Sequence, residues 1–136
     1  MIVNNEIAIL IVDDFAIIRR IIKRMLNDMG YYNTFEANDG LVAWSMLKRD
    51  HFDFVITDWS MPRMEGIDLL RCIRKDQRLQ FLPVLMITAE ATREHMIMAA
   101  QAGVNGYIVK PFVFETFRDK LDKIFQRIEF DKKTTE

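Results

Sequence analysis

The sequence has few of the residues that build disulfide or metal-thiolate frameworks. It contains one cysteine, Cys72, and two histidines, His51 and His95, among 136 residues. A lone cysteine cannot close a disulfide within the chain, and no cysteine or histidine stands at the spacing of a zinc site. Redox chemistry is therefore not indicated, and we expect both histidines to be bystanders.

The sequence also lacks long hydrophobic runs and a strong charge of either sign. No apolar stretch approaches membrane-spanning length, and residues 1–6 lack the basic start and cleavage site of a signal peptide. The formal net charge of −1 gives no general attraction to nucleic acid. We expect a cytoplasmic monomer that binds neither nucleic acid nor membrane and meets charged partners through a local patch.

The sequence does have enough apolar residues for one hydrophobic core. Half of the residues, 50%, are hydrophobic and 29% are charged, which are ordinary values for a globular protein. A chain of 136 residues suits a single domain. We predict a domain over residues 7–128, preceded by an extension at 1–6 and followed by a short flexible tail at 129–136.

Short apolar runs alternate along the chain with segments of helical periodicity. Unbroken apolar runs rich in β-branched residues are typical of parallel strands buried on both faces, and Gly30 and Gly103 are typical helix stops. The pattern predicts an α/β fold of the flavodoxin-like, doubly wound type, with a five-stranded parallel sheet and right-handed crossovers. The predicted strands are 7–12, 32–37, 54–57, 84–87 and 107–109, and the predicted helices are 15–29, 41–49, 66–75, 92–102 and 113–128.

Several of the apolar runs end on a chemically capable residue. Asp13 and Asp14 follow the first run, Asp58 the third, Thr88 the fourth and Lys110 the fifth. An aspartate in such a place can also cap a turn or helix, and Asp58 taken alone would fit that interpretation. The polar residues at the ends of the other strands favour a ligand site instead, because ligands of open α/β sheets bind outside the carboxyl ends of the strands.

Four short motifs resemble the receiver domain of bacterial response regulators, in family order and at family spacing. They are Val12-Asp13-Asp14, Asp58-Trp59-Ser60-Met61-Pro62, Thr88-Ala89-Glu90 and Lys110-Pro111-Phe112, within a resemblance that covers about residues 7–128. The resemblance implies the strand order 2-1-3-4-5, the order that this fold type commonly has. Strands 1 and 3 would then be neighbours, and Asp13, Asp14 and Asp58 would converge.

Three converging carboxylates repel one another unless they take up protons or a cation neutralises them. Oxygen ligands without cysteine or histidine favour Mg²⁺, which commonly bridges carboxylates to phosphate. With Mg²⁺ and Lys110 supplying positive charge, Asp58 becomes a plausible nucleophile towards a phosphoryl group. The product would be an aspartyl phosphate.

The resemblance also implies a role for individual residues. Asp58 would be the phosphoacceptor, with Asp14, Asp58 and the Ser60 backbone carbonyl as direct metal contacts and Asp13 acting through water. Lys110 would pair with the phosphoryl group, Thr88 would donate a hydroxyl hydrogen bond, and the Lys110-Pro111 peptide would be cis. The resemblance further implies that Thr88 and Tyr107 act as switch residues and that Ser60 and Glu90 tune the reactions at the site. The partner-binding face would consist of Met96, Tyr107, Val109, Phe117, Lys120 and Lys123.

The chain departs from the family pattern at four positions. Ala16 and Ile17 replace hydroxyl residues, and Ser60 replaces an amide, which puts the rate and assistance of dephosphorylation in doubt. Val113 replaces a threonine, which puts partner affinity in doubt.

The resemblance is to single-domain chemotaxis members, which implies a stand-alone regulator rather than an enzyme acting on an external substrate. Its partners would be a sensor histidine kinase of the chemotaxis type, the flagellar motor switch protein and, as an option, a dedicated phosphatase. A non-motor partner, or service as a phosphate sink or phosphorelay intermediate, is the alternative.

Other classes fit the residues less well. A haloacid dehalogenase-type phosphatase would carry Asp-x-Asp after the first strand, whereas the acids here are adjacent. A Rossmann or P-loop protein would need glycines after that strand, and acids at the switch point would repel a flavin phosphate. A fused transcription factor would need room for a recognition helix after the last helix, and residues 129–136 offer none.

Overall fold

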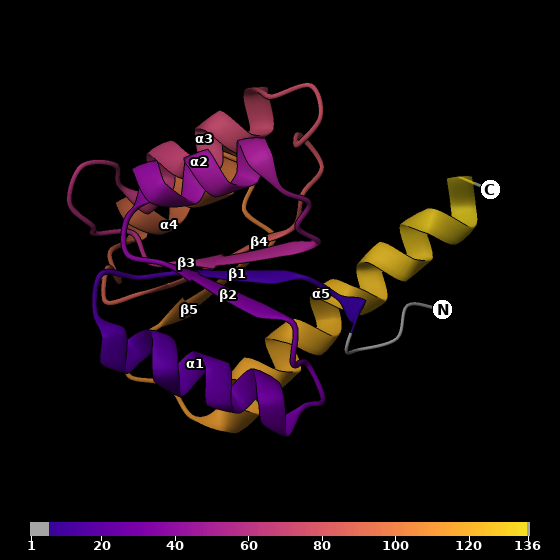
Figure 1. Cartoon of the computed structure of the whole chain (residues 1–136), viewed down its shortest axis with the longest axis horizontal. Helices are drawn as coiled ribbons and strands as arrows, with labels where there is room; N and C mark the ends of the chain where they lie inside the picture. Colours follow the sequence, from indigo (N-terminus) through magenta and orange to yellow (C-terminus); the bar gives the residue numbers. More distant parts are fainter. Residues whose placement is uncertain (1–5, 136) are drawn as a thin grey trace.

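The protein folds as one parallel sheet sandwiched between helices, in a computed structural model that describes residues 6–135 and, for 129–135, the backbone alone. The strand order is β2-β1-β3-β4-β5, which confirms the predicted flavodoxin-like topology (Figure 1). The elements in chain order are β1 (Ile9–Val12), α1 (Ala16–Asp28), β2 (Thr34–Ala37), α2 (Gly40–Arg49), β3 (Phe54–Thr57), α3 (Gly66–Lys75), β4 (Val84–Thr88), α4 (Arg93–Gln101), β5 (Gly106–Val109) and α5 (Phe114–Thr135).

The central strands are buried on both faces, which explains why their sequences do not alternate between apolar and polar residues. Every residue of β1, β3 and β4 is buried. Leu10 and Val12 point into the core beneath α2 and α3, while Ile9 and Ile11 point into the core that contains residues of α1 and α5. Figure 1 shows the same two layers, with α1 and α5 on one face and α2, α3 and α4 on the other.

Two element boundaries differ from the prediction for physical reasons. β2 is an edge strand that begins at Thr34 rather than at residue 32, because its pairing with β1 begins with Thr34 opposite Ile9. β1 begins at Ile9 rather than at residue 7, and the Ala8 amide instead donates to the Asp53 carboxylate at 2.9 Å. Apart from the C-terminal end of α5, the other predicted helices and strands agree with the structure to within about two residues, as expected of frayed ends.

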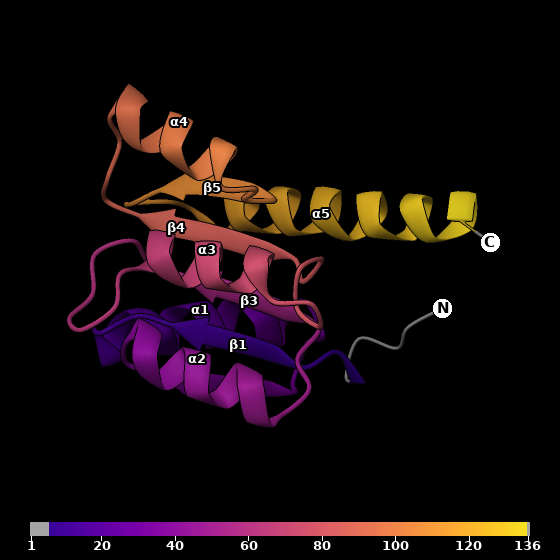
Figure 2. The same cartoon turned by 90° about the horizontal axis from the view of Figure 1, so that it is seen from above.

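The last helix is longer than expected. α5 runs to Thr135, whereas we expected the helix to end at 128 and a flexible tail to follow. No glycine or proline stands between Phe112 and Glu136, so the sequence provides no helix stop there. Figure 2 shows the end of α5 projecting past the sheet. Residues 1–5 of the predicted N-terminal extension, and Glu136, lie outside the described residues.

The parallel arrangement brings all strand ends to one edge of the sheet, and the loops after β1, β3, β4 and β5 meet there. The projecting end of α5 lies at the opposite edge (Figures 1 and 2). Within residues 6–135, no helix has the length and apolar character needed to cross a membrane.

The loop between β3 and α3 is tied to α2 through Asp39. This buried residue caps α2 by accepting a hydrogen bond from the Val42 amide at 2.9 Å, and Arg63 Nε donates to its other oxygen at 2.7 Å. Arg63 has φ 66°, a left-handed conformation that is uncommon outside glycine. The ion pair therefore holds a strained position of the loop. Although burial opposes its charge, these partners lower the pKa of Asp39 below its usual value of 3.8.

We predict that Asp39→Ala lowers the free energy of unfolding by about 1–2 kcal/mol, because a helix cap and an ion pair are lost. Asp39→Asn keeps the capping oxygen and should cost less. Because the folded-state pKa is lowered, the contribution of the charge is present above pH 3.8 and is lost as the pH falls below that value. Urea unfolding should therefore show wild type and Asp39→Asn converging in acid. A gap that persists unchanged there would contradict the assignment; Asp50→Asn, at an exposed aspartate, is the control.

Candidate functional site

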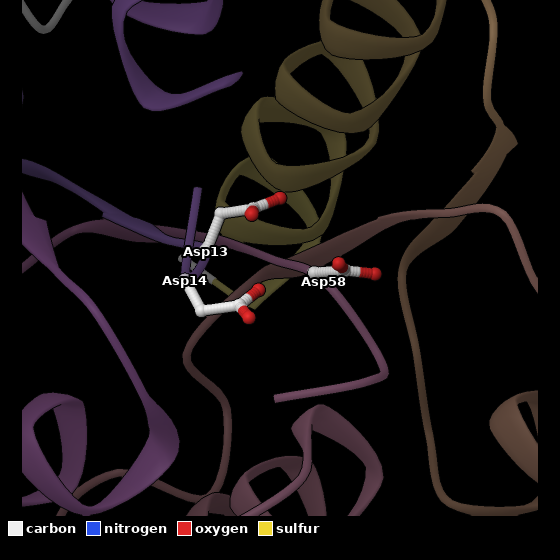
Figure 3. Close-up of side chains that lie close together, drawn as sticks. All are labelled: Asp13, Asp14 and Asp58. Atoms are coloured by element: carbon white, nitrogen blue, oxygen red, sulfur yellow. The ribbon is translucent and has the colours of Figure 1, made fainter. Parts of the chain in front are cut away.

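Three acidic side chains meet at the ends of β1 and β3. Val12 lies opposite Thr57 in the parallel register, so the residues that follow, Asp13 and Asp58, emerge side by side. One carboxylate oxygen from each of Asp13, Asp14 and Asp58 lies within 4.8 Å of the others. Figure 3 shows the three side chains extending to the same side of the strand ends. The predicted convergence of the acids is therefore found.

The backbone around Asp58 is held on several sides. Its amide donates to the Val12 carbonyl at 2.9 Å, and the Thr57 hydroxyl donates to its carbonyl at 2.9 Å. A Cβ added to Gly66 would lie 1.8 Å from that same carbonyl, so only glycine lets the first turn of α3 approach so closely. The Asp58 Oδ1 atom accepts from the Trp59 amide at 2.6 Å. The Asp58 side chain is therefore fixed at the sheet edge.

Lys110, just after β5, reaches across the end of β4 to the acids. Its Nζ atom donates to Asp13 Oδ2 at 2.9 Å and to Asp58 Oδ2 at 3.2 Å. Burial disfavours the ammonium, but its hydrogen bond to Asp13 and the charges of Asp58 and Asp13 outweigh burial and raise the pKa of Lys110. Lys110 is therefore a cation at neutral pH. The Lys110-Pro111 peptide is cis, as predicted.

Lys110 balances only part of the negative charge of the three carboxylates. Three aspartates against one lysine leave two negative charges to be balanced when all are ionised. Burial raises the pKa of Asp13, although the Phe15 amide and Lys110 oppose the shift. Asp14, by contrast, is exposed. Oxygen donors, excess negative charge and one open side fit a hard divalent cation that keeps some of its waters.

Thr88 and Tyr107 are linked through the backbone of Glu90. The buried Thr88 hydroxyl accepts a hydrogen bond from the Glu90 amide at 3.2 Å, and the Tyr107 hydroxyl donates to the Glu90 carbonyl at 2.5 Å. Burial, followed by the charges of Glu90 and Asp58, raises the pKa of Tyr107. The tyrosine ring is half-buried. The two residues expected to act as a switch are thus both hydrogen-bonded to Glu90, in the loop after β4.

The residues predicted for partner binding do not all reach the surface. Met96 on α4 and Lys123 on α5 are exposed, and Val109 and Lys120 are partly exposed. Phe117 is 0% exposed and packs in the core beside Phe112, so it does not belong to a binding surface. The prediction for Phe117 was wrong because its position in the helix pattern fits a core residue as well as a contact.

The histidines divide between the two edges of the sheet. His51 is exposed and pairs with Asp53 at 2.9 Å, away from the acidic cluster, as expected of a bystander. His95 instead lies against Trp59, with ring centroids 4.8 Å apart, and near Glu90. The sequence contains no signal for this contact, because it joins the loop after β3 to the first turn of α4.

Comparison with known proteins identifies relatives across nearly the whole chain. Residues 9–122 match the response regulator receiver domain family. The chain is 64% identical to chemotaxis protein CheY-3 of Vibrio cholerae, covering 93% of this chain and 98% of the relative, and 60% identical to chemotaxis protein CheY of Pseudomonas aeruginosa, covering 88% and 97%. The crystal structure of Vibrio cholerae chemotaxis protein CheY4 superposes with a TM-score of 0.79 at 33% identity, covering 87% and 98%.

We predict that a divalent cation quenches or shifts the fluorescence of Trp59, which is 4% exposed and hydrogen-bonded to Asp58 through its amide. Asp14→Ala should weaken the titration by about tenfold or more, since even outer-shell substitutions typically cost about 10–100-fold in metal affinity. A Trp44→Phe background isolates the signal of Trp59. An unchanged titration curve for Asp14→Ala would exclude that residue as a ligand.

Proposed function

The chain belongs to the response regulator receiver domains and is a CheY-like chemotaxis member, and from this premise we propose that it accepts a phosphoryl group on Asp58. The observation that carries the proposal is the contact of Asp58 with Lys110 beside two further acids. This arrangement gives a carboxylate nucleophile a fixed cation and a site for a second one. The phosphoryl group would come from the phosphohistidine of a chemotaxis-type sensor kinase.

In the proposed step, a carboxylate oxygen of Asp58 forms a bond to phosphorus while the bond from phosphorus to the donor's imidazole nitrogen breaks. The nitrogen retains the electron pair of that bond. Lys110 already lies within hydrogen-bond distance of the acceptor carboxylate, and its ammonium would then donate to the phosphoryl oxygens. Hydrolysis later returns the carboxylate: water attacks phosphorus, the bond to Asp58 breaks, and orthophosphate leaves.

The donor set fits Mg²⁺, which we propose as the cation of the site. Asp14, Asp58 and the Ser60 carbonyl would hold it directly and Asp13 through water. When bound, Mg²⁺ neutralises negative charge on the phosphoryl oxygens. Asp13, which accepts from Lys110 at 2.9 Å, also keeps the lysine oriented towards the acceptor. The chain itself would therefore contribute a nucleophile, an oriented ammonium and a set of oxygen ligands.

Thr88 and Tyr107 would pass the event on. A hydrogen bond from the Thr88 hydroxyl to a charged phosphoryl oxygen contributes about 1.5–3 kcal/mol. Moving a population from about 1:99 to 99:1 needs about 5.5 kcal/mol. Thr88 alone is too weak, so Lys110 and loop contacts must add to it, or the resting protein must already sample the active form. Loss of the hydrogen bond from the Glu90 amide to the Thr88 hydroxyl would release the loop after β4. Tyr107 donates its own hydrogen bond to this loop, at the Glu90 carbonyl.

The output would pass through the face formed by α4, β5 and α5. It combines the adaptable side chains of Met96 and Tyr107, and the neighbouring Val109, with the basic residues Lys120 and Lys123. Such a surface suits an acidic amphipathic segment. We propose the flagellar motor switch protein as the partner and the cytoplasm as the place of action.

We predict that the wild-type protein incorporates one phosphoryl group from a small phosphodonor with Mg²⁺, and that Asp58→Asn abolishes incorporation. The isosteric amide keeps the fold and removes the nucleophile. The measurement is intact-protein mass spectrometry or radiolabelling of the trapped acyl phosphate. Unchanged labelling of Asp58→Asn would refute the assignment; Asp50→Asn, at an exposed aspartate, should label normally.

We predict that Lys120→Glu weakens binding to the switch segment by on the order of tenfold and reduces its salt dependence, because charge complementarity on a partly exposed rim is reversed. Labelling of Asp58 should remain intact. Lys75→Glu, at an exposed site on α3, controls for the change in net charge. If the phosphorylated protein binds the segment no more tightly than the unphosphorylated one, the chain serves a non-motor partner or a phosphate sink.

A further inference from the structure

The carboxylate of Glu90 is contacted by His95, a residue of α4 that lies outside the acidic cluster. Its Oε1 atom accepts from the Ser60 hydroxyl at 2.9 Å, and its Oε2 atom lies 3.5 Å from His95 Nε2. Ser60 stands two residues after the acceptor Asp58. The Glu90 carboxylate is therefore shared between the acceptor loop and the first turn of α4.

The imidazole of His95 is fixed on its other sides. Its Nδ1 lies 2.5 Å from the Thr92 hydroxyl, which also accepts from the His95 amide at 3.2 Å. An ionised carboxylate can only accept, so the arrangement places a ring hydrogen on Nε2, facing Glu90, and Nδ1 then accepts from the Thr92 hydroxyl. The edge-on packing of the ring against the buried Trp59, at an interplanar angle of 83°, fixes its plane.

We propose that His95 is a positioning residue that keeps the Glu90 carboxylate anchored beside Ser60 and away from an approaching phosphoryl group. Without the histidine, one carboxylate oxygen would lose its partner, and Glu90 would gain rotational freedom beside Ser60, in the loop that follows Asp58. A mobile negative charge at the entrance to the Asp58 site repels an anionic phosphodonor, because charges in a partly exposed site are incompletely screened. This inference rests on the proposed phosphoryl acceptance at Asp58.

The test compares loading rates with two small phosphodonors that differ in charge, acetyl phosphate as the dianion and phosphoramidate as the less charged donor. His95→Ala should slow loading by acetyl phosphate by about threefold to tenfold, the effect expected of one unscreened charge, and slow phosphoramidate less. His95→Gln offers Glu90 a donor of similar reach and should restore most of the rate. Arg93→Gln removes a charge from the adjacent exposed position and should load like wild type.

A second background tests whether the effect passes through Glu90. Glu90→Gln alone should load at least as fast as wild type, and adding His95→Ala to it should change the rate little, because no charge is left to position. A rate for His95→Ala equal to wild type, an equal slowing with both donors, or an undiminished slowing in the Glu90→Gln background would each overturn the inference. If wild type itself does not label, the proposed phosphoryl acceptance fails instead. If His95→Ala does not fold, Glu90→Gln decides: slower loading than wild type refutes the proposal, and equal or faster loading supports it.

Discussion

The repulsion among the carboxylates at the ends of β1 and β3 is the constraint on which the site depends. Ionised Asp13 and Asp58 can lie side by side at low cost only where an opposite charge is present, and Lys110 provides it at 2.9 and 3.2 Å. Lys110 comes from β5, on the far side of β4, so the sheet must be complete before the acids are balanced. The negative charge that Lys110 leaves unbalanced is the feature that fits a divalent cation.

The loop after β4 connects this charge balance to the surface. Glu90 uses its amide towards Thr88, its carbonyl towards Tyr107 and its carboxylate towards Ser60 and His95. One residue therefore contacts Thr88, Tyr107, the loop after β3 and α4. A shift of Thr88 towards a new oxygen would disturb all of these contacts together, because each is a directional hydrogen bond or ion pair on the same short segment.

The sequence predicts the parts of the protein that follow from local pattern. Uninterrupted apolar runs identify β1, β3 and β4, and Asp13, Asp58 and Thr88 are the residues that end these runs. Contacts between loops escape such reasoning, since nothing in the composition of residues 90–95 indicates that a histidine meets Trp59. The same limit explains Phe117, whose helical spacing suits a core residue and a surface contact alike, and the length of α5, where polarity was taken for disorder although no residue stops the helix.

The replacement at position 60 shows how one change in the sequence can be absorbed by its neighbours. Serine is shorter than the family's amide and carries one hydroxyl, which here donates to Glu90 at 2.9 Å. Because that hydrogen is engaged, the side chain has no second donor with which to orient a water towards Asp58. Ala16 and Ile17 add no hydroxyl from the side of α1. Beside the proposed aspartyl phosphate, these residues therefore offer few groups that could assist its hydrolysis, and the Ser60 hydroxyl depends on the position of Glu90. Its anchoring by His95 would then influence both the arrival of the phosphoryl group and the time for which it remains.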